Sequence, residues 1–229
     1  MQKHTTPNPH DIVQWEPFDP RSLLESLKIH FPDTFHRGLG LWEGYNLEEH
    51  TLMVLRQFEK YFSSKSLPGG FSKAQFRYFL AIHDIGKPDW VSKKKIGTQA
   101  DYNLKAFRAH FPKDPFIGYE QRRLLESFLS DDPIGSYLKL KRWKGHPDPE
   151  DRQTCVSRLL QMHELSGSWL SRSEFLDSFL VYYMSDAGSY TVDAGGLKSL
   201  DEHFDFGDGK MDFSPSTKKW VDAVRDRFV

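Results

Sequence analysis

The stretch from Ala81 to Pro88 places an imidazole beside a carboxylate, because His83 and Asp84 directly follow an apolar run. Gly86 and Pro88 come next, and both residue types interrupt helices. A charged pair at the end of an apolar helix face is costly to bury unless it is paired or bound to a metal ion. We therefore expect other parts of the chain to complete a site around His83 and Asp84.

Further side chains able to bind a metal lie on, or at the edge of, apolar helix faces, three or four residues from a hydrophobic side chain: His50, His110, His163 and Asp186. Each alone is commonly a satisfied core histidine, or an aspartate that caps a helix or forms a buried ion pair. Several imidazoles together with carboxylates, however, are what a divalent transition metal binds. Cys155 is offset from His163 by roughly 80° around the same helix, so we do not expect it to be a ligand.

The order of these residues resembles the HD-domain superfamily of metal-dependent phosphohydrolases, which is named for its His-Asp pair. His50 precedes the pair His83–Asp84, and Asp186 follows it. The resemblance spans residues 43–190 and is carried by three helical segments in the family's order: 43–51, 82–88 and 185–187. It implies an all-α HD-domain bundle.

By this resemblance, His50, His83, Asp84 and Asp186 would bind one divalent ion, such as Mn, Fe, Co, Ni or Mg. Some subfamilies hold two ions, using two more histidines between the His-Asp pair and the last aspartate. His110 and His163 occupy suitable places in the order. In a two-metal site Asp84 would bridge the ions.

The implied chemistry is hydrolysis of a phosphomonoester or phosphodiester, with a small phosphorylated molecule, expected to be a nucleotide, as substrate. A bound divalent ion lowers the pKa of water, and the resulting hydroxide attacks phosphorus in line with the leaving oxygen. Asp84 and Lys87 are the expected catalytic residues, and Lys87 would contact a substrate phosphate. Further candidate substrate contacts are Lys105, Arg108 and Tyr190.

Two alternatives remain open within the same resemblance. A di-iron oxygenase of this fold would need both His110 and His163 as additional ligands. A non-catalytic sensor would bind a nucleotide without hydrolysing it, although a sensor need not keep every ligand. The hydrolase branch specific for (p)ppGpp is disfavoured, because Lys87-Pro88 stands where that branch has an acidic pair. The cyclic-di-GMP branch is disfavoured because its Gly-Tyr-Pro signature is absent.

The elements that must position these residues all follow helical periodicity, which predicts an all-α protein of roughly nine or ten helices. We expect residues 1–20 to form an extended or poorly ordered arm, residues 21–229 a single domain, residues 87–97 a loop, and 196–229 the C-terminal helices. The remaining predicted helices cover residues 21–31, 47–62, 72–83, 98–111, 118–130, 132–143 and 151–165, with one more beginning near Ser171 or Ser173.

Composition narrows the class of protein further. The net charge is −1 over 229 residues, with well-mixed acidic and basic side chains, so charge favours neither a nucleic-acid nor a membrane partner. The single cysteine allows no disulfide within the chain and favours a reducing compartment. The N-terminal residues lack the apolar core of a secretory signal, and we expect a cytoplasmic protein. The sequence does not determine the oligomeric state.

Overall fold

Helices account for almost all of the regular structure in this computed structural model, which describes residues 7–35, 45–110, 116–144, 148–195 and 200–229. Nine helices have ten residues or more within that part of the chain, which confirms the expected all-α class. They are α2 (Pro20–His30), α4 (Leu47–Tyr61), α5 (Lys73–Ile82), α7 (Gln99–His110), α8 (Tyr119–Ser130), α9 (Pro133–Lys144), α10 (Pro149–Leu165), α11 (Arg172–Gly188) and α12 (Pro215–Phe228). The shorter elements are α1 (Pro9–Ile12), α3 (Pro32–Phe35), α6 (Lys87–Ser92), the 3₁₀ turns η1 (Pro68–Gly70), η2 (Val192–Ala194), η3 (Asp201–His203) and η4 (Gly207–Gly209), and the strands β1 (Phe204–Asp205) and β2 (Asp212–Phe213).

Reciprocal side-chain caps fix where the central helices begin. Ser72 caps α5 and Ser171 caps α11, each accepting a hydrogen bond from the backbone three residues later. The side chain at that later position bonds back to the capping residue, which completes a capping box. The helix starts expected near Ser72 and Ser171 are therefore confirmed.

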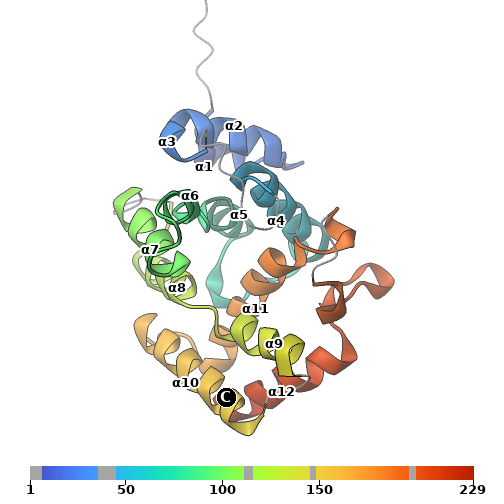
Figure 1. Ribbon diagram of the computed structural model, residues 1–229. Coiled ribbons are helices and arrows are strands. Elements are labelled where there is room, and N and C mark those ends of the chain that lie inside the picture. Colours follow the sequence, from blue (N-terminus) through green and yellow to red (C-terminus); the bar gives the residue numbers. More distant parts are fainter. Residues whose placement is uncertain (1–6, 36–44, 111–115, 145–147, 196–199) are drawn as a thin grey trace, which may run out of the picture.

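Helix α4 packs against both α5 and α11 near the middle of the molecule, as Figure 1 shows. Helices α7 and α8 pack against each other, and α10 contacts α8, α9 and α12. The core contains many phenylalanine side chains that are at most 1% exposed, among them Phe58, Phe76, Phe79, Phe128 and Phe179. Burial of each such ring contributes about 2–3 kcal/mol to the stability of the fold. These rings therefore help to hold α4, α5 and α11 against one another.

The described part of the N-terminal segment differs from the extended arm that we expected for residues 1–20. Helix α1 begins there, and Ile12 and Val13 are fully buried. The expectation was wrong because Pro9 lies at the start of α1 and Pro20 at the start of α2, where proline is compatible with a helix. Residues 1–6 lie outside the described part of the chain.

The predicted loop over residues 87–97 is also partly wrong, because its first half forms α6. Pro88 lies in the first turn of that helix, where no backbone N–H donor is needed, so it helps to start α6 rather than only ending α5. Within the predicted C-terminal helices, the structure has an antiparallel pairing of β1 with β2 before α12. Residues 196–199, like residues 36–44, lie outside the described part of the chain.

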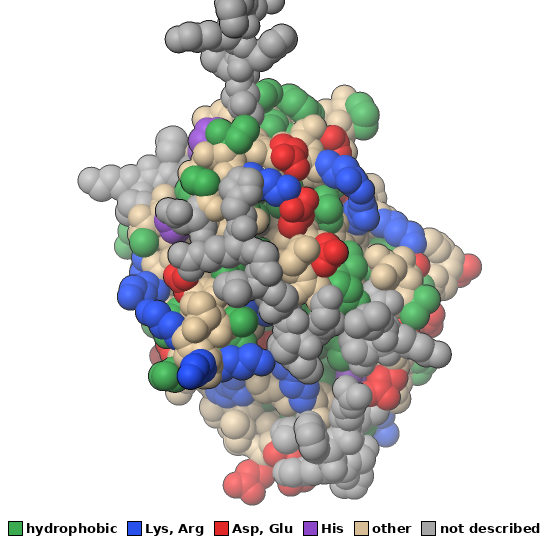
Figure 2. Space-filling view, turned by 45° about the horizontal axis from the view of Figure 1, so that its top comes forward, with side chains coloured by type: hydrophobic (Ala, Val, Ile, Leu, Met, Phe, Trp, Pro, Cys, Tyr) green, Lys and Arg blue, Asp and Glu red, His purple; other side chains and the backbone are tan. Residues whose placement is uncertain are grey.

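The surface carries both signs of charge. Figure 2 shows acidic and basic side chains interspersed with apolar ones on one face. Within the described ranges, the helices are too short or too polar for any of them to span a bilayer.

Candidate metal centre

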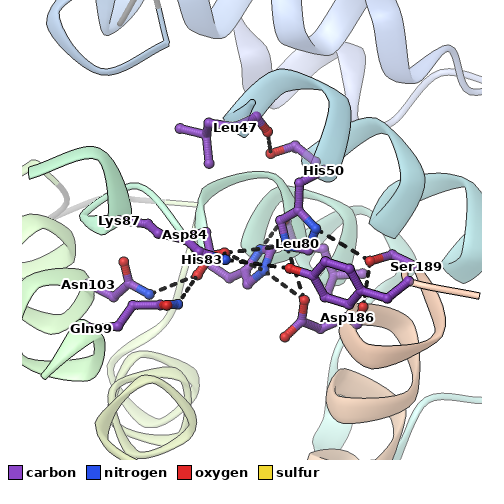
Figure 3. Close-up of polar contacts among 12 residues, drawn as sticks. Leu47, His50, Leu80, His83, Asp84, Lys87, Gln99, Asn103, Asp186 and Ser189 are labelled. Atoms are coloured by element: carbon purple, nitrogen blue, oxygen red, sulfur yellow. Dashed lines mark hydrogen bonds and ion pairs between the residues drawn. The ribbon is translucent and has the colours of Figure 1, made fainter. Parts of the chain in front are cut away.

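Three helices bring the chemically active side chains together near the centre of the fold (Figure 3). His50 lies in the first turn of α4, whose start is fixed by a capping box. His83 is the C-terminal cap of α5, and Asp84 follows it. Asp186 lies in the last turn of α11. The histidines and Asp84 are at most 5% exposed, whereas the Asp186 side chain is 31% exposed, although its Oδ1, which faces the histidines, is buried.

The Nε2 atoms of the two histidines face the same two carboxylates. Nε2 of His50 lies 3.1 Å from Oδ1 of Asp186 and 3.3 Å from Oδ2 of Asp84. Nε2 of His83 lies 3.4 Å and 3.8 Å from those same two oxygens. Ligands about 2.1 Å from one ion are roughly 3.0–3.4 Å apart in octahedral or tetrahedral arrangements. The four atoms therefore have nearly the spacing of ligands around a single ion.

Hydrogen bonds on the other ring nitrogens fix both histidine tautomers. Nδ1 of His83 donates to the backbone oxygen of Leu80 at 2.7 Å. Ser189 donates its hydroxyl proton to the Asp186 backbone oxygen at 2.6 Å, so its Oγ can accept from Nδ1 of His50 at 3.4 Å. In the neutral form of each histidine, Nε2 therefore presents a lone pair to the carboxylates.

Three of the facing acceptor atoms have no hydrogen-bond partner among the described residues. They are buried, and they comprise Nε2 of His50, Nε2 of His83 and Oδ1 of Asp186. Buried acceptors that face one another without a donor are costly. A cation at their common centre would satisfy all of them, so this donor set fits a metal ion. His50, His83 and Asp84 also place one ligand atom each within 4.8 Å of one another.

The charges of the site shift the pKa values of its members. Burial lowers the pKa of His83, but the charges of Asp84 and Asp186 outweigh burial and raise it to about 9. Burial raises the pKa of Asp84, yet Lys87 and the two histidines hold it well below its ordinary value. The histidines likewise lower the pKa of Asp186 against the effect of burial. Without a metal, a proton on His83 is therefore the cation that the two carboxylates retain.

Additional polar groups surround Asp84. Nζ of Lys87, which is 3% exposed, lies 3.2 Å from Oδ2 of Asp84 and 3.4 Å from the hydroxyl of Tyr190. Gln99 and Asn103, both from α7, donate to the other oxygen, Oδ1, at 2.9 Å each. The ring of Tyr190 stacks on His50 with centroids 4.9 Å apart. Lys87 and Tyr190, both predicted substrate contacts, therefore lie in the site.

His163 does not join the centre. Its Nε2 donates to the backbone oxygen of Leu170 at 2.9 Å, and its ring packs edge-on against Phe175 and Phe228. Phe175 lies eleven residues before Asp186 on α11, or about 16 Å along the helix axis. The structure thus makes His163 a core histidine whose hydrogen bonds hold the turn after α10.

His110 also lies away from the group formed by His50, His83, Asp84 and Asp186. It is exposed at the C-terminal end of α7, where it packs edge-on against Phe31. It follows Asn103 by seven residues, or about 10 Å along the helix axis. A second ion bound by His110 and His163 is therefore incompatible with this arrangement.

The other two predicted substrate contacts are surface residues of α7. Lys105 is exposed. Arg108 pairs with Glu126 of α8 through bonds of 2.9 and 2.7 Å. That pairing ties α7 to α8 and gives Arg108 a structural role.

Sequence reasoning missed Gln99, Asn103 and Ser189 as members of the site. A signal for the first two was present, because Gln99, Asn103 and Phe107 recur every four residues and so share one face of α7. Two carboxamides in line with a core phenylalanine indicate a polar partner near that end of the helix. Ser189 gave no such signal.

In comparisons with known proteins, no family model, curated protein or solved structure matches this chain. The class of site therefore rests on the geometry of its residues.

Proposed function

We propose that this protein is a metal-dependent phosphohydrolase that uses one divalent ion held by His50, His83, Asp84 and Asp186. The observation that carries the proposal is the convergence of two histidine lone pairs and two carboxylate oxygens on one buried point. The order of these ligands along the chain, which resembles that of the HD-domain phosphohydrolases, supports it further.

The donor set indicates which ions suit the site. Two imidazole nitrogens favour Mn, Fe, Co or Ni over Mg, which prefers oxygen ligands and near-ideal octahedral geometry. The hydrogen bonds on Nδ1 of His50 and His83 orient the rings and raise the basicity of each Nε2. A bound divalent ion would supply a water of lowered pKa as the nucleophile and stabilise charge on phosphoryl oxygens.

Residues of the chain itself would bind and orient the phosphate. The Lys87 ammonium is almost fully buried beside the centre, where its interaction with an anion is strengthened by the low local dielectric. The Tyr190 hydroxyl lies 3.4 Å from that ammonium and can donate to the same phosphoryl group. With a divalent ion bound, the positive charge of the ion and Lys87 exceeds the negative charge of Asp84 and Asp186, which favours an anionic substrate.

The positions of the histidines favour a hydrolase over the oxygenase alternative. A di-iron centre of this fold needs six protein ligands, and His110 and His163 would have to supply two of them. Instead, His110 packs against the Phe31 ring, and His163 donates a hydrogen bond to the backbone oxygen of Leu170. A nucleotide sensor differs from a hydrolase only in lacking turnover, so an activity measurement separates the two.

The direct test measures two products: inorganic phosphate released from nucleoside monophosphates and other phosphomonoesters, and nucleoside monophosphate formed from cyclic nucleotides. We expect turnover with added Mn²⁺ or Co²⁺ and none with excess chelator. His83→Ala and Asp84→Ala should abolish it, whereas His163→Ala, which removes a buried histidine elsewhere, should retain it in the folded fraction. Turnover by both His83→Ala and Asp84→Ala at the level of the unaltered protein would refute the proposal.

A further inference from the structure

We infer that Gln99 and Asn103 are positioning residues that occupy one oxygen of Asp84 and thereby limit the centre to a single metal ion. The inference rests on the proposed function, since it assumes that Asp84 binds a metal. It adds a role for two residues of α7 that carry no charge and do not face the ion. Figure 3 shows both side chains pointing at Asp84 from the side opposite the histidines.

Oδ1 of Asp84 is occupied by hydrogen bonds from two carboxamides. The Gln99 and Asn103 carboxamides each donate a hydrogen bond of 2.9 Å to this oxygen. A carboxylate oxygen has two lone-pair sites, so two donors fill its capacity. Asn103 is 5% exposed, and its bond to Asp84 is buried, so water competes poorly for this oxygen.

The orientation of the Asn103 carboxamide is fixed by the turn that follows Asp84. The backbone N–H of Gly86 donates to Oδ1 of Asn103 at 3.0 Å, which turns the NH₂ group toward Asp84. That contact requires α7 to approach the Gly86 backbone very closely. A Cβ at Gly86 would lie 2.2 Å from the backbone oxygen of Tyr102. The turn after Asp84 therefore orients the residue that holds Asp84.

The other oxygen of Asp84, Oδ2, is the one that faces the histidines. It faces the Nε2 atoms of His50 and His83 and lies 3.2 Å from the Lys87 ammonium. A carboxylate can bridge two ions through both oxygens or through one shared oxygen. The carboxamides oppose the first arrangement, and repulsion from Lys87 opposes the second. Asp84 thus offers one oxygen to one ion.

The test measures metal binding rather than activity. The full-length protein is stripped with chelator and titrated with Mn²⁺ and Co²⁺ by calorimetry, and bound metal is counted by elemental analysis. We expect one ion for each chain. Gln99→Met and Asn103→Leu keep approximate volume but remove the donors, and each should weaken metal binding about tenfold to a hundredfold.

Gln75→Met is the matched control. Gln75 lies on α5, and its carboxamide donates to the backbone oxygen of Phe116 without touching Asp84. It should lower stability and leave the metal dissociation constant unchanged. If Asn103→Leu fails to fold, Gln99→Met alone decides, because the Gln99 side chain is only half-buried.

The outcomes separate this inference from the proposed function. Two ions bound tightly by the unaltered protein, or unchanged affinity in Gln99→Met, would overturn the inference and leave a metal-dependent hydrolase intact. If the unaltered protein binds no divalent ion, the proposed function and this inference both fail.

Discussion

Nε2 of His50 lies 3.1 Å from Oδ1 of Asp186, and neither atom has a hydrogen-bond partner in the described part of the chain. One atom belongs to the first turn of α4 and the other to the last turn of α11. Two acceptors are held this close only when the surrounding fold forces them together or when a cation joins them. Metal binding and the pH dependence of stability distinguish these two cases.

A divalent metal should stabilise the folded protein strongly, because the site exists only when α4, α5 and α11 are packed together. At a free ion concentration of a hundred times Kd, binding contributes about 2.7 kcal/mol. For a chain of this size that raises Tm by about 5–10 °C in differential scanning calorimetry. Asp186→Asn should abolish the increase. Asp193→Asn is the control, since Asp193 bonds Lys60 and Tyr61 instead, and should retain the full increase.

The stability of the metal-free protein should depend on pH through His83. Its folded-state pKa is raised to about 9, above the unfolded value of about 6.5. The stabilisation is therefore complete below about pH 6.5 and is lost as the pH rises toward 9, by an amount on the order of 3 kcal/mol. Urea denaturation in chelator at several pH values measures this loss. The same slope in His83→Gln as in the unaltered protein would contradict the assignment.

Metal affinity should change in the opposite sense over the same pH range. The proton on His83 competes with the ion for Nε2, so the apparent Kd should fall as the pH rises from about 6.5 to 9. Isothermal titration of chelator-treated protein at fixed ionic strength checks this, with correction for the ionisation of the buffer. An affinity that is constant over this range would indicate that His83 does not bind the ion.

Gly86→Ala should damage the centre without touching a ligand. The new Cβ would lie 2.2 Å from the Tyr102 backbone oxygen, so α7 must move away and Asn103 with it. Overpacking of this kind costs about 1–3 kcal/mol, and metal affinity should fall together with the unfolding free energy. Gly207→Ala is a control, because its Cβ would meet its nearest atom at an ordinary 3.6 Å.

Glu59→Gln should destabilise the protein by about 3 kcal/mol, since Arg77 is 1% exposed and its charge would lose its main partner. Arg77 donates to both Glu59 oxygens at 2.7 Å and to the Val13 backbone oxygen at 2.9 Å. Urea denaturation measures the loss. Arg77→Met combined with Glu59→Gln should recover part of it, and an additive double variant would argue against a coupled pair.

His163→Gln should behave differently from His83→Gln. It removes a side chain that bonds the Leu170 backbone oxygen, and we expect a loss of about 1–3 kcal/mol in stability with the metal dissociation constant unchanged. Calorimetric unfolding and metal titration of the two variants make the comparison. Loss of metal binding in His163→Gln would restore this residue to the centre.

The helices were predictable because leucine and phenylalanine side chains recur every three or four residues, and this spacing indicates which face of each helix is buried. The places of His50, His83 and Asp186 on those faces marked them as candidates, and the grouping of these three with Asp84 around one ion was implied by the resemblance to the HD-domain phosphohydrolases. The possible second ion, with His110 and His163 as its additional ligands, does not agree with where the structure places these two residues. His163 has the same spacing to leucine as His83 has to phenylalanine, but its bond to Leu170 depends on a turn whose geometry the spacing does not encode.

The roles of several prolines and neutral polar residues could not be predicted from their sequence neighbours alone. Pro9, Pro20 and Pro88 mark helix starts here, and a proline before a helix looks the same in a sequence as one in a loop. Gln99 and Asn103 act through α7 packing onto the turn at Gly86, so their role depends on a long-range contact.

The ligands of the centre also set when it can form during synthesis. The bond that orients His50 comes from Ser189, which follows it by 139 residues. Chains grow by about 5–20 residues per second, so roughly 7–28 s pass before the ribosome adds that partner. His83 and Asp84 are added within that interval and, like His50, lack the serine and the last carboxylate until it ends. The four side chains can come together only after α11 docks onto α4, so any metal that they bind is acquired late in synthesis or after it.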